Sequence, residues 1–185
     1  SSDETGAKTA MLKDINGSGN SSPQNFVQMY YAVYFTADDG TNGTELWKTD
    51  GTESGTVLVK NINGTAAGSS ISGLTSLGSL LIFSATTATE GAELWVSDGT
   101  TLGTTLLKDI VSGATGSSPS SITKVGSTVF FTANTGTGAG GTGAELWKTD
   151  GTDAGTVIVK DINPGTSNSS PSSLIAVGSQ LFFMA

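Results

Sequence analysis

Short apolar segments recur along the chain, and stretches rich in Gly, Ser, Thr, Asn and Asp separate them. The segments are rich in Val, Ile, Leu, Phe and Tyr, which are common in strands, and the residues between them are those that favour turns. No window has an apolar period of about 3.6 residues that lasts longer than one helical turn. The pattern therefore predicts an all-β protein with essentially no helix.

Four kinds of segment alternate in a fixed order, and together they define one unit. The first kind covers residues 26–29, 74–77, 122–125 and 174–177, and the second covers 33–37, 81–85, 129–133 and 181–185. The third kind carries Glu-Leu-Trp, and the fourth covers 11–15, 57–62, 106–110 and 157–162. The second and fourth kinds are apolar at consecutive positions, which is typical of strands covered on both faces. Four-stranded antiparallel meanders stacked face to face, as in the blades of a β-propeller, would provide that environment.

A longer sequence motif, Glu-Leu-Trp-x-x-Asp-Gly-Thr, recurs from unit to unit. It begins at Glu45, Glu93 and Glu145, and its tryptophans, Trp47, Trp95 and Trp147, are 48 and 52 residues apart. A period of about 40–50 residues indicates a repeat architecture, in which neighbouring units must stack to bury their apolar faces. We expect each tryptophan to fill the space between two units, because its large apolar area suits that role.

The chain begins and ends inside a repeat unit and not at a unit boundary. We interpret residues 1–185 as a single repeat domain of about four units of ~48 residues, with a short insertion near residues 136–141. The approximate unit bounds are 1–15 (partial), 16–62, 63–110, 111–162 and 163–185 (partial). One Glu-Leu-Trp segment, equivalent to residues 38–48, is missing where the two partial units would meet. Three arrangements remain open: a closed four-bladed ring, a segment of a longer repeat array, and a head-to-tail polymer formed by strand addition.

The repeated phrase resembles a bacterial repeat family that is named for its consensus, ELWxxDGTxxGT. All three copies match its eight fixed positions, from Glu45 to Thr56, from Glu93 to Thr104 and from Glu145 to Thr156. The resemblance implies a building block of large exported or surface-attached bacterial proteins. One departure is Tyr30-Tyr31, which replaces the Gly-Ser turn of the other units and puts the first hairpin in doubt.

The composition excludes several functions. The net charge is −8, and the eight basic residues are all lysines, which argues against nucleic-acid binding. The chain has no Cys and no His, so it cannot form a disulfide, a thiolate metal site or a Ser-His or Cys-His catalytic pair. No apolar run approaches the ~18 residues that a membrane span needs. We therefore expect an acidic extracellular or cell-surface protein that is not an enzyme and does not insert into membranes.

The recurrent charged residues are candidates for a structural role. Catalytic groups are usually unique in a chain, whereas these recur once per unit, and we expect an ion pair between Glu and Lys of neighbouring strands or units. The full set of recurrent residues is Glu45, Glu93, Glu145, Trp47, Trp95, Trp147, Lys13, Lys60, Lys108 and Lys160.

Calcium is the one metal that the pattern allows, and otherwise no cofactor is expected. Carboxylates in Gly-rich loops could join backbone carbonyls as hard ligands. The competing and simpler interpretation is that Asp-Gly-Thr builds the turn. The candidate ligands are Asp38, Asp39, Asp50, Asp98 and Asp150.

Five Asn-x-Ser/Thr sites fall in predicted loops, where a glycan would be tolerated. They are Asn16, Asn20, Asn42, Asn63 and Asn168, although the high Ser and Thr content alone produces such sites. Tyr30 and Tyr31 are the one aromatic pair outside the repeat pattern and the best candidates for a contact surface, with internal packing as the favoured explanation.

Two functions follow from these observations. The first is a structural repeat module of an extracellular assembly, whose partner is another copy and which forms a fibre by strand complementation. The alternative is a propeller lectin that binds glycans in the clefts between units, because repetition favours multivalent binding.

Overall fold

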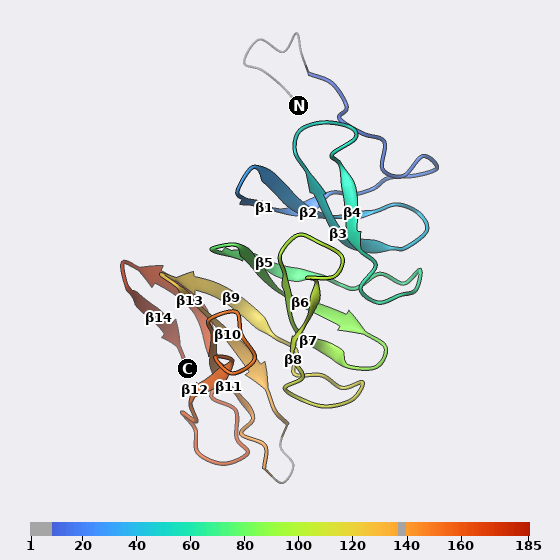
Figure 1. Ribbon diagram of the computed structural model, residues 1–185. Coiled ribbons are helices and arrows are strands. Elements are labelled where there is room, and N and C mark those ends of the chain that lie inside the picture. The colour runs from blue at the N-terminus through green and yellow to red at the C-terminus, as the bar shows by residue number, and fades with distance from the viewer. Residues whose placement is uncertain (1–8, 137–139) are drawn as a thin grey trace.

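The computed structural model describes residues 9–136 and 140–185, which form β-strands joined by turns and loops (Figure 1). No helix occurs in these residues, and every strand pair in the sheets is antiparallel. The prediction of an all-β fold is thus confirmed. The alignment of residues 2–5 and the centre of the insertion near residues 136–141 lie outside the described residues.

The strands form four sheets, here called A to D, each a meander in which neighbours along the chain pair. Sheet A contains β1 (Gln24–Met29), β2 (Ala32–Asp38), β3 (Thr44–Thr49) and β4 (Val57–Lys60). Sheet B contains β5 (Ser72–Leu77), β6 (Leu80–Thr87), β7 (Gly91–Ser97) and β8 (Thr105–Lys108). Sheet C contains β9 (Ser120–Val125), β10 (Thr128–Asn134), β11 (Ala144–Thr149) and β12 (Val157–Lys160). Sheet D has two strands, β13 (Ser172–Val177) and β14 (Gln180–Met184).

Successive sheets stack along the chain, and their first strands lie next to one another. β1 contacts β5, β5 contacts β9, and β9 contacts β13. Figure 1 shows the sheets following one another in an arc, with the first strands toward its inner side.

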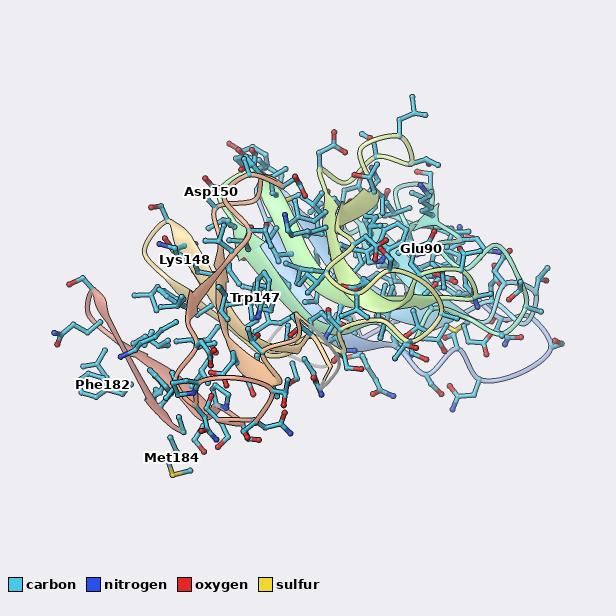
Figure 2. The ribbon with its side chains drawn as sticks, turned by 90° about the horizontal axis from the view of Figure 1, so that it is seen from below. Glu90, Trp147, Lys148, Asp150, Phe182 and Met184 are labelled. Carbon is cyan, nitrogen blue, oxygen red and sulfur yellow. The ribbon has the colours of Figure 1, made fainter. Side chains whose placement is uncertain are left out.

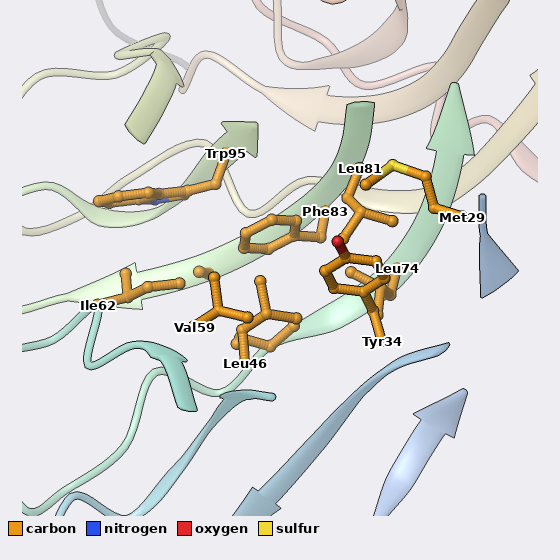
Figure 3. Packing of buried hydrophobic residues seen from close by; sticks show 11 residues of the cluster. Met29, Tyr34, Leu46, Val59, Ile62, Leu74, Leu81, Phe83 and Trp95 are labelled. Atoms are coloured by element: carbon orange, nitrogen blue, oxygen red, sulfur yellow. The ribbon is translucent and has the colours of Figure 1, made fainter. Parts of the chain in front are cut away.

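The core lies between the sheets. One apolar cluster joins sheet A to sheet B (Figure 3), and a second joins sheet B to sheet C. The first contains Met29, Tyr34, Leu46 and Val59 from sheet A, and Leu74, Leu81, Phe83 and Trp95 from sheet B. The second contains the equivalent Leu77, Ile82, Leu94 and Leu107 from sheet B, and Val129, Phe131, Ala133 and Trp147 from sheet C. The same face-to-face contact is therefore used twice. In each case the face of a sheet that is turned toward the next sheet along the chain, here called its later face, packs on the facing side of that next sheet, here called its earlier face.

Each first strand contains an irregularity that the apolar pattern did not reveal. The register between the first and second strands shifts after Gln24, Ser72 and Ser172, and between Ser120 and Thr123 of β9. The residue that follows the shift point has a positive φ in every sheet: Asn25 (56°), Gly73 (65°), Ser121 (53°) and Ser173 (54°). An inserted residue of this kind bends the strand, which is a common device in curved or closed sheets.

Two expectations from the sequence are wrong. Residues 11–15 are not a strand, because no strand of the described residues lies beside them to share backbone hydrogen bonds. Tyr30 and Tyr31 are exposed, so internal packing does not explain them. The first hairpin nevertheless forms with Met29 opposite Ala32, because Tyr30 adopts the left-handed φ of 54° that glycine adopts in the other units.

Candidate functional site

The recurrent glutamates bind the connections between sheets. Each is fully buried on the third strand of a sheet, and its carboxylate accepts hydrogen bonds from the loop that leads to the next sheet. Glu45 accepts from Ser69 Oγ (2.5 Å) and from the backbone N–H of Ile62 (3.1 Å). We call each such glutamate, with the serine it binds, a glutamate clamp.

The other two clamps repeat this geometry. Glu93 accepts from Ser117 Oγ at 2.6 Å and from the backbone N–H of Ser117 at 2.9 Å. Glu145 accepts from Ser169 Oγ at 2.6 Å and from the backbone N–H of Ser169 at 3.0 Å. Three equivalent clamps therefore fix the connections A to B, B to C and C to D. The predicted ion pairs between these glutamates and the recurrent lysines are wrong, because serine and backbone groups take the place of lysine.

Burial governs the titration of two clamps. It raises the pKa of Glu45 and of Glu93 above the ordinary value, although the hydrogen bonds from Ser69 and Ser117 act in the opposite direction. A carboxyl group whose oxygens are buried and already bonded within the protein has no room for a substrate. The arrangement therefore suits a structural role.

The sequence pattern does not point to the serine of the clamp. A signal for it exists, because Ser21, Ser69, Ser117 and Ser169 each stand three residues before a first strand. Serine is so frequent in this chain that the recurrence was not distinctive. Only the fold brings Ser69, Ser117 and Ser169 each to a glutamate 24 residues earlier.

The recurrent lysines bind carbonyl groups of the following unit. Lys13 Nζ donates to the carbonyl of Thr56 (2.7 Å), and Lys60 Nζ donates to that of Thr104 (2.6 Å). Lys108 Nζ instead lies 3.2 Å from both the carbonyl and Oδ1 of Asp153. Each of these lysines therefore joins a fourth segment to the turn hairpin of the next sheet. Lys160 is exposed, and no bond of its side chain is found within the described residues.

The three tryptophans lie between units, as expected. Trp95 and Trp147 are buried in the two clusters described above, and Trp47 packs with Phe35 and the half-buried Ile15. The Nε1 atoms of all three are buried, and no hydrogen-bond partner is found for them within the described residues. Their contribution to the interfaces is therefore apolar contact area.

The aspartates of the repeated phrase build its turn. Asp50 Oδ1 accepts hydrogen bonds from the backbone N–H and Oγ1 of Thr52, and Asp98 and Asp150 do the same with Thr100 and Thr152. These hydrogen bonds, led by those from the threonine hydroxyls, hold the pKa values of the three carboxyls below their ordinary range. The contacts agree with the turn interpretation.

The calcium candidates do not come together. Asp38 Oδ1 accepts from the N–H of Gly40, and Asp39 Oδ1 accepts from those of Thr41 and Asn42. Within residues 9–136 and 140–185, no three Asp or Glu side chains are grouped as metal ligands. Calcium binding stays a prediction, with no cluster of carboxylates in the described part of the chain to favour it.

The five glycosylation candidates lie outside the strands but differ in exposure. Asn20 and Asn168 are exposed, whereas Asn42 and Asn63 are half-buried. Asn16 is buried, and its Oδ1 accepts hydrogen bonds from the N–H and Oγ of Ser18. A glycan on Asn16 would require this loop to open.

Several hollows border sheet A. One of about 340 Å³ has a largely apolar lining that includes Leu12, Ile15, Phe26 and Phe35. Another of about 270 Å³ lies between the first and second units, and Gln24, Asn25, Thr36 and Thr44 are among the residues that line it. The first lies between residues 12–15 and the earlier face of sheet A.

Comparisons with known proteins do not assign a family. No protein-family model, curated protein or solved structure matches this chain. Over the described residues, no helix has both the length and the apolar character to cross a bilayer.

Proposed function

We propose that this chain is a non-enzymatic structural repeat module of an extracellular or cell-surface assembly, built from β-propeller-like blades that associate head to tail. The observation that carries the proposal is the repeated use of one contact between unlike faces. A contact between two different faces generates rings or open filaments when it is repeated, because each added unit presents the same face again.

Part of each half of this contact is exposed at the ends of the stack, although Phe35, Ala37 and Trp47 on the earlier face of sheet A are buried. Sheet D presents Val177 and Phe182 (Figure 2), which are equivalent to the buried Leu77 and Ile82 of sheet B. Sheet A presents Phe26 beside the apolar hollow of about 340 Å³. Sheet D of one copy would therefore pack on sheet A of the next, and the open edge of β14 allows strand pairing to reinforce the contact.

The side chains that could perform chemistry support a role without catalysis. The recurrent glutamates bind connecting loops, and the recurrent aspartates bind their own turns. An acidic chain also remains soluble through charge repulsion, which is in keeping with a secreted protein. Extracellular location and glycans at exposed sites such as Asn20 and Asn168 belong to the same proposal.

Lectin activity is the alternative that binding experiments should include. Polar hollows lie between units, but the lining of the hollow around Gln24 and Asn25 contains no aromatic side chain on which a sugar ring could stack.

The test is assembly of the purified chain at increasing concentration. Sedimentation velocity should show concentration-dependent oligomers, and electron microscopy should show filaments or rings. Phe182→Asp should abolish assembly, because a charge would be buried at the contact. Leu102→Asp is the matched control, since Leu102 is exposed on a turn of sheet B, away from the proposed contact.

Two results would contradict the proposal. One is a chain that stays monomeric at every concentration, with no difference between the two variants. The other is glycan binding by dispersed monomers, which would favour the lectin.

A further inference from the structure

Asparagine precedes glycine at Asn16, Asn42 and Asn63, and such pairs rearrange without an enzyme. The backbone nitrogen of the glycine loses its proton and attacks Cγ of the asparagine. The side-chain nitrogen gains a proton and leaves as ammonia, and water then opens the succinimide ring to aspartate or isoaspartate. Glycine favours the attack because it has no side chain to hinder it. The three pairs are alike in sequence, so their order of reactivity depends on the contacts that each makes in the fold.

At Asn16, the contacts favour each part of this reaction. Its Oδ1 accepts hydrogen bonds from the backbone N–H (3.3 Å) and the Oγ (3.2 Å) of Ser18, and these donors stabilise the negative charge that develops on this oxygen during the attack. Within residues 9–136 and 140–185, no hydrogen bond holds the Nδ2 of Asn16 or the backbone N–H of Gly17. Gly17 is exposed, and a Cβ added to it would meet no atom within 4 Å. The nucleophile and the leaving group are therefore both free.

Asn63 occupies the equivalent position in the next unit, but there the same groups are held in place. The backbone N–H of Gly64, which carries the attacking nitrogen, donates to Oδ1 of Asn61 (2.8 Å). The Nδ2 of Asn63 donates to the carbonyl of Gly68 (2.9 Å) and to Oγ1 of Thr65 (3.2 Å). Its Oδ1 is buried, and no donor for it is found in the described part of the chain. These contacts oppose the attack, the departure of ammonia and the charge on the oxygen.

Asn42 is restrained in a different way. Its Nδ2 donates to Oδ2 of Asp39 (2.7 Å), and its Oδ1 accepts from Nδ2 of Asn61 (2.8 Å). Departure of ammonia would break the charge-assisted hydrogen bond to Asp39, and the carboxylate opposes the negative charge of the intermediate. Gly43 is half-buried, and a Cβ on it would lie 2.5 Å from the backbone nitrogen of Gly68. The backbone at Gly43 therefore has little room to turn toward the side chain.

We propose that Asn16 is the preferred site of spontaneous succinimide formation in this chain, with Gly17 as the nucleophile and Ser18 as the group that stabilises the developing charge. Water is the one co-reactant of the complete reaction. The inference goes beyond the proposed assembly and does not depend on it, because every contact that carries it is made within single loops of one copy.

The modification should loosen the loop of residues 16–21 from the loop between β2 and β3. The Asn16 carboxamide lies so close to Gly40 that a Cβ at Gly40 would be 2.8 Å from Oδ1. The Gly40 N–H donates to the carboxylate of Asp38, so conversion places a second negative charge near this one. The backbone N–H of Asp38 donates to the carbonyl of Ser21 (2.9 Å), and loosening should speed hydrogen exchange at this amide.

The experiment incubates the purified chain at mildly alkaline pH and follows conversion at the three sites by peptide mapping with mass spectrometry. In the folded chain, Asn16 should convert at least about tenfold faster than Asn42 and Asn63, as expected from differences of two or more hydrogen bonds. In guanidinium chloride the three sites should convert at similar rates, because the unfolded chain has lost the contacts that distinguish them.

Two variants test the contacts in opposite directions. Ser18→Ala removes the Oγ donor and should slow conversion of Asn16 about fivefold in the folded chain, with no effect in guanidinium chloride. Asn61→Ala removes the acceptor of the Gly64 N–H and should speed conversion of Asn63 while leaving Asn16 unchanged. In each variant, the site that is not affected serves as the internal control.

The inference is overturned if Asn16 converts no faster than the other two sites in the folded chain, or if Ser18→Ala leaves its rate unchanged there. Unchanged hydrogen exchange at the Asp38 amide after conversion would overturn the effect on the loop. All these rates are measured at a concentration at which the chain is monomeric, so their outcome is separate from that of the assembly experiment.

Discussion

Sheets B and D have nearly the same apolar pattern in their first two strands but very different surroundings. Sheet B lies between sheets A and C, and the apolar side chains of β6 from Leu81 to Phe83 are fully buried. In β14, Phe182 and Phe183 are 52% and 37% exposed. Burial in this repeat therefore comes from the neighbouring unit, so equivalent residues contribute unequally to stability.

Replacing the equivalent phenylalanines of sheets B and D tests this comparison directly, and it should give the largest loss of stability. Phe83→Ala should lower the free energy of unfolding by about 4 kcal/mol, because it creates a cavity between sheets A and B. Phe183→Ala should cost less than about 1 kcal/mol, since its surroundings are already open to water. Urea unfolding of both variants measures the difference, and equal losses would show that sheet D is as well covered as sheet B.

The glutamate clamps should be the next most sensitive feature. Glu93→Ala leaves the buried Ser117 hydroxyl and two backbone N–H groups without their acceptor, which should cost about 3 kcal/mol. Glu53→Ala, at an exposed position on a turn of sheet A, should change stability by less than about 0.5 kcal/mol. A similar loss for both variants would mean that the clamp is not what holds sheets B and C together.

The clamps also predict a pH dependence of stability. Burial raises the pKa of Glu45 and of Glu93 above 4.5, so the folded chain keeps these protons to a higher pH than the unfolded chain does. Between pH 4.5 and the raised pKa of the folded chain, the folded state therefore binds more protons, and the contribution of the Glu45 and Glu93 clamps to stability falls as the pH rises through this range. Glu93→Gln should make the decline above pH 4.5 shallower in urea unfolding at several pH values, while Glu53→Gln should leave it unchanged.

The smallest expected effect concerns the hairpin turns of the first and last units. Tyr30 has a φ of 54°, and Gly178 has a φ of 60° at the equivalent position. Tyr30→Gly should stabilise the chain by about 0.5–1 kcal/mol by relieving the left-handed strain. Gly178→Ala should destabilise sheet D by a similar amount. Thermal unfolding monitored by circular dichroism compares the two, and a loss of stability in Tyr30→Gly would contradict the strain argument.

Most of the strands, their order in each meander, the repeat period and the position of the tryptophans between units follow from the sequence. These features depend on local apolar patterns and on turn residues such as Asp50-Gly51, whose effect acts over a few positions. The sequence also indicated that the recurrent glutamates are structural, because they recur with the scaffold.

The contacts of each recurrent residue depend on the packed structure and do not follow from the sequence. Glu45 binds Ser69 rather than a lysine, and Lys60 binds a backbone carbonyl of the next unit. Residues 11–15 are not a strand, although their pattern matches the fourth strand of other units, because a strand needs a partner to receive its hydrogen bonds. Phe83 and Phe183 likewise differ only in their neighbours. A local pattern states which face of a strand is apolar, and only the packed structure shows whether another surface covers that face.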